Sequence, residues 1–146
     1  MVVYADTSFL FSLYASDINS DAANAQIRPL NRPLLYTSLQ NLELRNALRL
    51  ACFRGEISKA QSYELLTLID GDKEKGVLVE AQVIWRDVYD LAEELSARYS
   101  DLTGNRSLDI LHVSIALTLQ AEHFWTFDQR QHKLAELSGM EVNKLS

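Results

Sequence analysis

The sequence has 146 residues, of which 47% are hydrophobic and 23% are charged, proportions that are typical of a globular protein. It carries 14 basic and 20 acidic residues, and the net charge of -6 counts against a protein that coats nucleic acid non-specifically. The single cysteine, Cys52, excludes an internal disulfide and any site built from several cysteines, and it favours a reducing compartment such as the cytoplasm. The length predicts one domain over residues 1–146, and no apolar run approaches the ~20 residues of a membrane-spanning helix.

Hydrophobic spacing predicts strands that alternate with helices along the chain. In chain order, we expect a buried strand at 2–5, helices at 7–15 and 21–27, a strand at 34–37, and a helix at 39–53 that Ser38 caps and Gly55 ends. A helix capped by Ser58 should end before Gly71, a charged loop should span 71–76, and an edge strand should follow at 77–80. The remaining elements are expected to be helices at 83–99 and 107–121, a strand at 123–127, a helix at 129–137 and a strand at 140–145. This order predicts an α/β sandwich with a mostly parallel central sheet.

Four acidic residues lie near the predicted carboxyl ends of the strands, where open α/β sheets bind their ligands. They are Asp6 and Asp128 directly after strands, Glu43 on the helix after the second strand, and Asp109 in the first turn of an apolar helix. A simpler interpretation stays open for each of them. Aspartate caps helices, the helix dipole favours a first-turn carboxylate by roughly 0.3–1 kcal/mol, and Glu43 fits a solvated helix face.

Bare carboxylates that meet at one sheet edge repel one another, by about 4 kcal/mol at ~4 Å and an effective dielectric constant near 20. A protein tolerates such a group by protonating one acid or by binding a cation. The sequence offers no thiolate or histidine cluster, so the ligands would be hard oxygens, which suit Mg²⁺ or Mn²⁺. A cation of this kind makes bound water a better nucleophile and neutralises charge on a phosphate, which points to phosphodiester hydrolysis.

Four segments of the sequence resemble one known family, in the same order and at similar spacing. They are VVYADTSFL around Asp6, SLQNLELRNAL around Glu43, RSLDILHVSIAL around Asp109 and FWTFDQRQHKLA around Asp128. The sequence resembles the PIN-domain ribonucleases, and most closely the VapC-like toxins of type II toxin–antitoxin pairs. The resemblance implies a three-layer α/β/α sandwich, an acidic pocket for Mg²⁺ or Mn²⁺, and cleavage of single-stranded RNA. It also implies a homodimer and an antitoxin whose tail covers the pocket.

Carried over residue by residue, the resemblance makes Asp6, Glu43 and Asp109 the catalytic and metal-binding acids, with Asp128 joining them directly or through water. Neighbouring polar residues are expected to support these acids or the phosphate. They are Thr7 and Ser8, which equally fit helix-start hydroxyls, Thr126 on the strand before Asp128, and Asn46, which equally fits a surface amide. Three arginines beside the acids, Arg45, Arg106 and Arg130, are hypothesised to contact the RNA backbone, although solvated surface arginines would have the same spacing.

His112 lies three residues after Asp109 and therefore on the same helix face. We expect a packed histidine bonded to a neighbouring carboxylate rather than a general base. A nucleotide-binding or phosphotransfer domain is disfavoured, because the sequence lacks GxGxxG after its first strand and lacks GxxxxGK[ST]. A non-catalytic PIN module that acts by binding RNA or protein remains the alternative to the metal-dependent ribonuclease.

Overall fold

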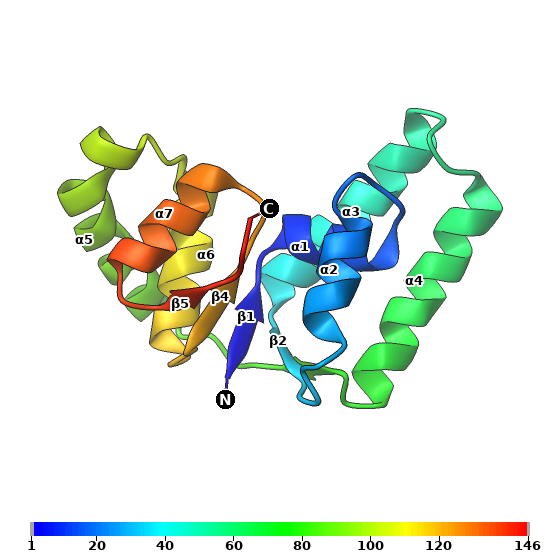
Figure 1. Ribbon diagram of the computed structural model, residues 1–146, viewed down its shortest axis with the longest axis horizontal. Helices are drawn as coiled ribbons and strands as arrows, with labels where there is room; N and C mark the ends of the chain where they lie inside the picture. Colours follow the sequence, from blue (N-terminus) through cyan, green and yellow to red (C-terminus); the bar gives the residue numbers. More distant parts are fainter. Residues whose placement is uncertain (1, 146) are drawn as a thin grey trace.

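The computed structural model describes residues 2–145, which form five strands and seven helices (Figure 1). In chain order these are β1 (Val3–Ala5), α1 (Thr7–Tyr14), α2 (Ser20–Ile27), β2 (Leu34–Tyr36), α3 (Ser38–Phe53), α4 (Lys59–Glu74), β3 (Leu78–Glu80), α5 (Trp85–Thr103), α6 (Ser107–Thr118), β4 (His123–Trp125), α7 (Gln129–Leu137) and β5 (Glu141–Val142). The alternation of strands and helices confirms the predicted α/β class. No helix within this part of the chain is long and apolar enough to cross a lipid bilayer.

The five strands form one sheet in the order β3-β2-β1-β4-β5, and every neighbouring pair is parallel. The chain adds β2 and β3 on one side of β1 and then crosses over to add β4 and β5 on the other side. The strand order therefore reverses between β1 and β4. In sheets of this type, that reversal opens a crevice beyond the carboxyl ends of the two strands.

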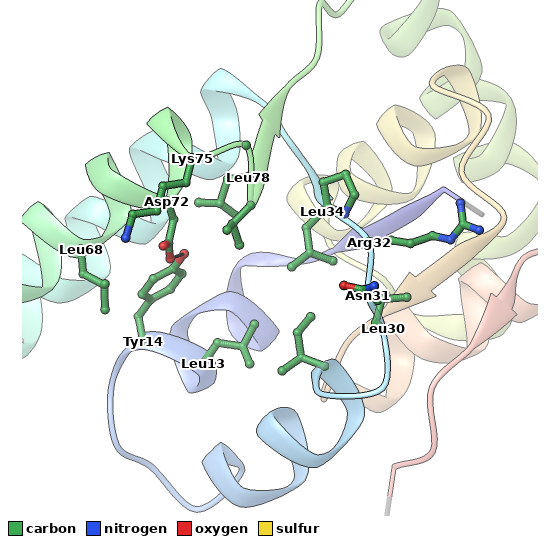
Figure 2. Close-up of a pocket in the computed structure, with 14 residues that line it drawn as sticks. Leu13, Tyr14, Leu30, Asn31, Arg32, Leu34, Leu68, Asp72, Lys75 and Leu78 are labelled. Atoms are coloured by element: carbon green, nitrogen blue, oxygen red, sulfur yellow. Dashed lines mark hydrogen bonds between the residues drawn. The ribbon is translucent and has the colours of Figure 1, made fainter.

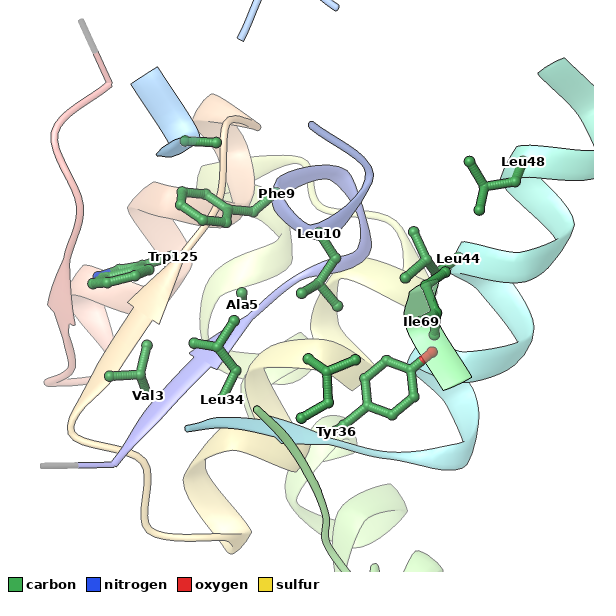
Figure 3. Packing of buried hydrophobic residues seen from close by; sticks show 12 residues of the cluster. Val3, Ala5, Phe9, Leu10, Leu34, Tyr36, Leu44, Leu48, Ile69 and Trp125 are labelled. Atoms are coloured by element: carbon green, nitrogen blue, oxygen red, sulfur yellow. The ribbon is translucent and has the colours of Figure 1, made fainter. Parts of the chain in front are cut away.

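Successive residues of a strand face opposite sides of the sheet, and here both sides are covered. Val3 and Ala5 of β1 pack with Phe9 and Leu10 of α1 in a cluster that also takes residues from α2, α3 and α4 (Figure 3). Tyr4, between them, belongs to a second cluster with residues of α5, α6 and α7. Figure 1 shows the two groups of helices on either side of the strands. The two clusters confirm the three-layer α/β/α sandwich.

The helix that was expected to stop before Gly71 continues through it to Glu74, so the predicted loop at 71–76 is largely helical. A glycine inside a helix costs only about 1 kcal/mol relative to alanine. The chain leaves the helix at Gly76, which has φ = +75°, a left-handed conformation that glycine adopts without strain. Gly76, rather than Gly71, is therefore the glycine that marks the end of helix α4.

The helix α3 is capped by Thr37 rather than by Ser38, the cap expected from the sequence. Thr37 Oγ1 accepts the N–H of Gln40, and the Gln40 side chain accepts the N–H of Thr37 in return. This reciprocal arrangement is a capping box, which satisfies two helix-end donors at once. Gln40 also donates to the carbonyl of Ala5 at 2.6 Å, so the same box ties the start of α3 to the end of β1.

The strand expected at 123–127 is shorter, because β4 ends at Trp125. The backbone of the next residue, Thr126, is bonded to a side chain rather than to a neighbouring strand. Its N–H donates to Oδ1 of Asn143 and its carbonyl accepts from Nδ2 of Asn143, both at 2.9 Å. This exchange turns the chain out of the sheet and toward the helix that begins after Asp128.

Candidate active site

A cavity of about 560 Å³ opens where the carboxyl ends of β1 and β4 lie side by side. The backbone N–H of Asp6 donates to the carbonyl of Trp125 at 3.0 Å, so the two strand ends are bonded together at the cavity floor. The residues that line the cavity come from four separate stretches of the chain: Asp6, Thr7, Ser8, Glu43, Arg106, Ser107, Leu108, Asp109, His112, Asp128 and Gln131. All four acidic residues selected from the sequence therefore border one cavity at the reversal of strand order.

Asp6 is the most buried of these acids, with 4% of its surface exposed. It is the N-cap of α1, and its Oδ1 accepts the N–H of Phe9 at 2.9 Å and the hydroxyl of Ser8 at 2.8 Å. Its Oδ2 accepts the hydroxyl of Thr126 at 2.6 Å. Burial raises the pKa of the Asp6 carboxyl, although these hydrogen bonds oppose the rise. A nearby cation would lower the free energy of the charged form.

Glu43 projects from α3 and is half-buried at the cavity wall. Its Oε1 accepts the hydroxyl of Thr7 at 3.0 Å and lies 2.6 Å from Nε2 of His112. Burial alone would raise the pKa of Glu43, but the His112 imidazole and the Thr7 hydroxyl together outweigh it and hold the pKa below its ordinary value. Glu43 is therefore a carboxylate at neutral pH. The expectation that His112 is a packed histidine bonded to a carboxylate is confirmed.

Asp109 and Asp128 both occupy helix starts, so their capping roles and their places at the cavity coexist. Oδ2 of Asp109 accepts the backbone N–H of Arg106 at 3.2 Å, in the first turn of α6. Asp128 is the N-cap of α7, and its Oδ1 accepts the N–H of Gln131 at 2.8 Å. The simpler interpretation of each acid is thus geometrically correct. It does not exclude a second role, because each carboxylate has further lone pairs at the cavity surface.

The carboxylates border the cavity without converging on one point. Within residues 2–145, no group of three or more His, Cys, Asp or Glu side chains is arranged to hold a metal ion by itself. The acids were expected to meet around a single ion, and the structure brings them to one cavity but not to that degree of closeness. Two of the carboxylates are instead bonded to hydroxyls and to His112.

The other residues selected from the sequence divide into two groups. Thr7, Ser8 and Arg106 line the cavity, and Thr126 lies directly beneath it, fully buried against Asp6. The structure does not bring the remaining three, Asn46, Arg45 and Arg130, into the lining of this cavity.

The three residues outside the cavity have different surroundings. Asn46 lies exposed on α3. Arg45 points into a separate cavity between α3 and α4, where its Nη1 lies 2.9 Å from Oδ1 of Asp70. Arg130 is exposed on the first turn of α7. Nearness to an acid along the chain therefore did not place Arg45 and Arg130 on the cavity wall.

Sequence reasoning missed two polar residues that build the site. Gln131 is buried, lines the cavity, and donates to the backbone carbonyl of Asp109 at 3.2 Å, which joins α7 to α6. Its position three residues after the N-cap Asp128 is the capping-box position, so a signal was present. Tyr4 resembles an apolar core residue within its strand, yet its hydroxyl lies 2.6 Å from Nδ1 of His112. Nothing in the local sequence identifies that contact.

Apart from the acidic cavity and the one beside Arg45, a cavity of about 500 Å³ lies between α1, α2 and α4 (Figure 2). Its wall is mostly aliphatic, including Leu13, Leu34 and Leu78. Asp72 is its single acidic residue among those the structure describes, and the hydroxyl of Tyr14 donates to that carboxylate at 2.6 Å. Figure 2 shows this pair at the edge of the cavity, with Lys75 nearby. This cavity does not offer the oxygen-rich surroundings of the cavity that the four acids border.

The PIN domain family model matches residues 3–137, which include all four acids. Among solved structures, the chain is similar to VapC20 from Mycobacterium tuberculosis, a sarcin-ricin loop cleaving toxin, with a TM-score of 0.70 and 15% identity over 97% of this chain and 99% of that chain. It is also similar to FitAcB from Neisseria gonorrhoeae, with a TM-score of 0.65 and 12% identity over 99% of this chain and 98% of that chain. No curated protein matches the sequence. The family match, together with the acids at the reversal of strand order, leads to one conclusion: the chain belongs to the PIN domain family.

Proposed function

We propose that the protein is an endoribonuclease that depends on a divalent metal and hydrolyses phosphodiester bonds of single-stranded RNA. The observation that carries the proposal is the cavity at the reversal of strand order, which four carboxylates border. Membership of the PIN domain family and the likeness to VapC20, which is named as a sarcin-ricin loop cleaving toxin, support it.

The donor set of the cavity fits Mg²⁺ or Mn²⁺. It consists of carboxylate and hydroxyl oxygens, and the single histidine is already bonded to Glu43. Mg²⁺ keeps several of its waters and binds through one or two carboxylates plus substrate phosphate, so the cavity does not need three converging carboxylates. Asp6, Glu43 and Asp109 would hold the ion, with Asp128 acting directly or through water. When bound, such an ion would activate water and neutralise charge on the phosphate.

The chain's own groups prepare the cavity for this chemistry. Ser8 and Thr126 hold the Asp6 carboxylate from both sides, and Thr7 and His112 hold Glu43. Arg106 lies at the rim, where its guanidinium suits a phosphate oxygen of the RNA. These contacts fix the carboxylates before the substrate arrives, which reduces the reorganisation that the reaction requires.

The test is cleavage of labelled single-stranded RNA by the purified protein in Mg²⁺, in Mn²⁺ and in EDTA. Cleavage should require the metal and should be lost in Asp6→Asn and Asp109→Asn, but it should persist in Asp90→Asn, a matched control on the exposed face of α5. Cleavage that continues in EDTA would contradict metal dependence. Absence of cleavage with every RNA and metal would favour the alternative, a PIN module that acts by binding RNA or protein.

We also propose that the protein is a homodimeric toxin whose antitoxin covers the cavity, and that it acts in the cytoplasm. The resemblance to VapC-like toxins supports this proposal, and exposed apolar side chains such as Tyr89 and Leu102 of α5 offer surface for a partner. Expression of the chain alone should arrest growth, whereas Asp6→Asn should not. Size-exclusion chromatography with light scattering should give the mass of a dimer, and a monomer would contradict that part of the proposal.

A further inference from the structure

A chain of hydrogen bonds leads from the interior of the sandwich to the cavity through Tyr4, His112 and Glu43. The Tyr4 hydroxyl lies 2.6 Å from Nδ1 of His112, and Nε2 of His112 lies 2.6 Å from Oε1 of Glu43. Tyr4 is fully buried on β1 and 4% of the His112 surface is exposed, whereas Glu43 faces the cavity. His112 also reaches the cavity wall, so Tyr4 is the member of the three that does not line the cavity.

The direction of the protons along this chain follows from the capacity of each group. A neutral imidazole has one N–H and one lone pair. The Glu43 carboxylate can only accept a hydrogen bond, so the ring hydrogen lies on Nε2 of His112 and donates to Oε1 of Glu43. Nδ1 of the neutral ring then accepts the hydroxyl hydrogen of Tyr4.

The two oxygens of Glu43 are used unequally. The Thr7 hydroxyl and the His112 ring both bond to Oε1, and no hydrogen bond from any residue between 2 and 145 reaches Oε2. Asp6 differs, since protein groups bond to both of its oxygens. Two donors on one oxygen fix the plane of the Glu43 carboxylate and leave the lone pairs of the other oxygen to a ligand in the cavity.

We propose that Tyr4 and His112 are positioning residues, which hold Oε1 of Glu43 and thereby present Oε2 to a hard cation in the cavity. The cation rests on the proposed function, but the orientation of Glu43 in the metal-free protein does not. Groups that orient a metal-binding carboxylate change metal affinity by about 10- to 100-fold when they are removed. A buried pair that served packing alone would change stability and leave that affinity unaltered.

The first experiment compares Tyr4→Phe with Tyr36→Phe. Both tyrosines are fully buried strand residues, but the Tyr36 hydroxyl bonds to Asn41 and lies outside the acidic cavity. Titration of the purified, metal-free proteins with Mn²⁺ should show affinity weakened by about 10-fold or more in Tyr4→Phe, and unchanged in Tyr36→Phe. Equal affinity in Tyr4→Phe and the wild type would overturn the role of Tyr4.

The second experiment compares His112→Gln with His112→Asn. The amide nitrogen of Gln extends to about the position of Nε2 and can donate to Glu43, whereas the shorter Asn stops near the position of Nδ1. Both variants place an amide in the same buried site, so they are matched for the cost of burial. Gln should retain most of the Mn²⁺ affinity and Asn should lose it. Unaltered affinity in both variants would show a packing role, and equal losses would exclude the donor to Glu43, so either result would overturn the role of His112.

A readout without metal separates this inference from the proposed function. The ¹³C signal of the Glu43 carboxyl, assigned by its absence in Glu43→Gln, should shift in Tyr4→Phe and His112→Asn and stay in place in Tyr36→Phe. If the wild type binds no Mn²⁺, the proposed function fails and this signal still decides the positioning role. An unshifted signal in both variants overturns that role, whether or not the protein binds metal.

Discussion

The hydroxyl of Thr126 lies 2.6 Å from Oδ2 of Asp6, although 120 residues separate them in the chain. The contact joins the segment after β4 to the residue after β1, across the reversal of strand order. Thr126 is fully buried, and its Oγ1 also accepts the backbone N–H of Asp128 at 3.0 Å. One hydroxyl thus fixes the acid at the cavity floor and the turn that carries a second acid.

Replacing Thr126 with valine preserves its shape and removes the hydroxyl. We expect Thr126→Val to lower the free energy of unfolding by about 1.5–3 kcal/mol, because a buried carboxylate loses a charge-assisted hydrogen bond. Thr126→Ser keeps the hydroxyl and is the control. Urea denaturation of the metal-free proteins measures the difference. If the valine variant is as stable as the wild type, the bond to Asp6 contributes nothing to folding.

The pKa of Asp6 makes stability depend on pH in a direction opposite to the usual one for an acid. Because burial raises its folded-state pKa, this carboxyl contributes stability that is fully present below its unfolded value, about 3.9, and that is lost as pH rises through the raised folded-state value. Glu43 behaves in the reverse way. Its pKa is lowered, so its contribution is present above its unfolded value, about 4.3, and is lost as pH falls through the lowered value.

These signs predict how two variants should differ from the wild type in EDTA. The melting temperature of Asp6→Asn minus that of the wild type should increase as pH rises from the acid range to neutrality, because the variant does not bear the cost of a buried charge. The melting temperature of Glu43→Gln minus that of the wild type should decrease over the same pH range. Thermal melts at a series of pH values measure both differences. Differences that do not change with pH would contradict the pKa directions.

How far the sequence predicts the site can be judged from individual residues. Asp6 follows a short apolar run whose end marks a strand terminus, and Asp128 follows another, so the parallel sheet brings them to one edge. The contact between Tyr4 and His112 was invisible for the opposite reason. It depends on how β1 packs against α6, and a tyrosine within an apolar strand looks like any other core residue.

The sequence-based expectation at Gly71 was wrong for a plain physical reason. Gly71 was expected to end a helix, but a glycine ends a helix only where the backbone takes a left-handed conformation, and that occurs at Gly76. The RNA contact of Arg45 stays a prediction, but its position two residues after Glu43 did not place it at the acidic cavity. On a helix, residues two apart do not share a face, and Arg45 bonds to Asp70 of α4 instead.

Replacing Asp109 distinguishes a metal-binding role of its carboxylate from a helix-capping role. We expect Asp109→Asn to match or exceed the melting temperature of the wild type without metal, since the amide oxygen can still accept the N–H of Arg106 and one negative charge leaves the cavity. The proposed metal site predicts that Mg²⁺ stabilises the wild type but not this variant, by an amount that grows with the ratio of ion concentration to Kd. Clear destabilisation of the metal-free variant would instead mean that Asp109 serves mainly the helix dipole.

The hypothesis that arginines bind RNA phosphates predicts that replacing them changes the salt dependence of RNA affinity. Replacement of Arg45, Arg106 and Arg130 together by alanine should weaken RNA binding and reduce the slope of log affinity against log salt by about 0.7 for each phosphate that the protein no longer neutralises. Because Arg106 alone of the three lines the cavity, Arg106→Ala should account for a larger part of the change than Arg45→Ala, whose guanidinium is paired with Asp70.

The binding measurement uses the Asp6→Asn background, in which the proposed function predicts no cleavage, so that the RNA stays intact while fluorescence anisotropy is recorded at several salt concentrations. Arg86→Ala, an exposed arginine of α5 outside the cavity, is the control for a general loss of positive charge. A triple variant with the affinity and salt slope of the control would exclude these arginines from the RNA interface. A loss confined to Arg106→Ala would restrict that interface to the rim of the cavity, which is the outcome that the ion pair of Arg45 favours.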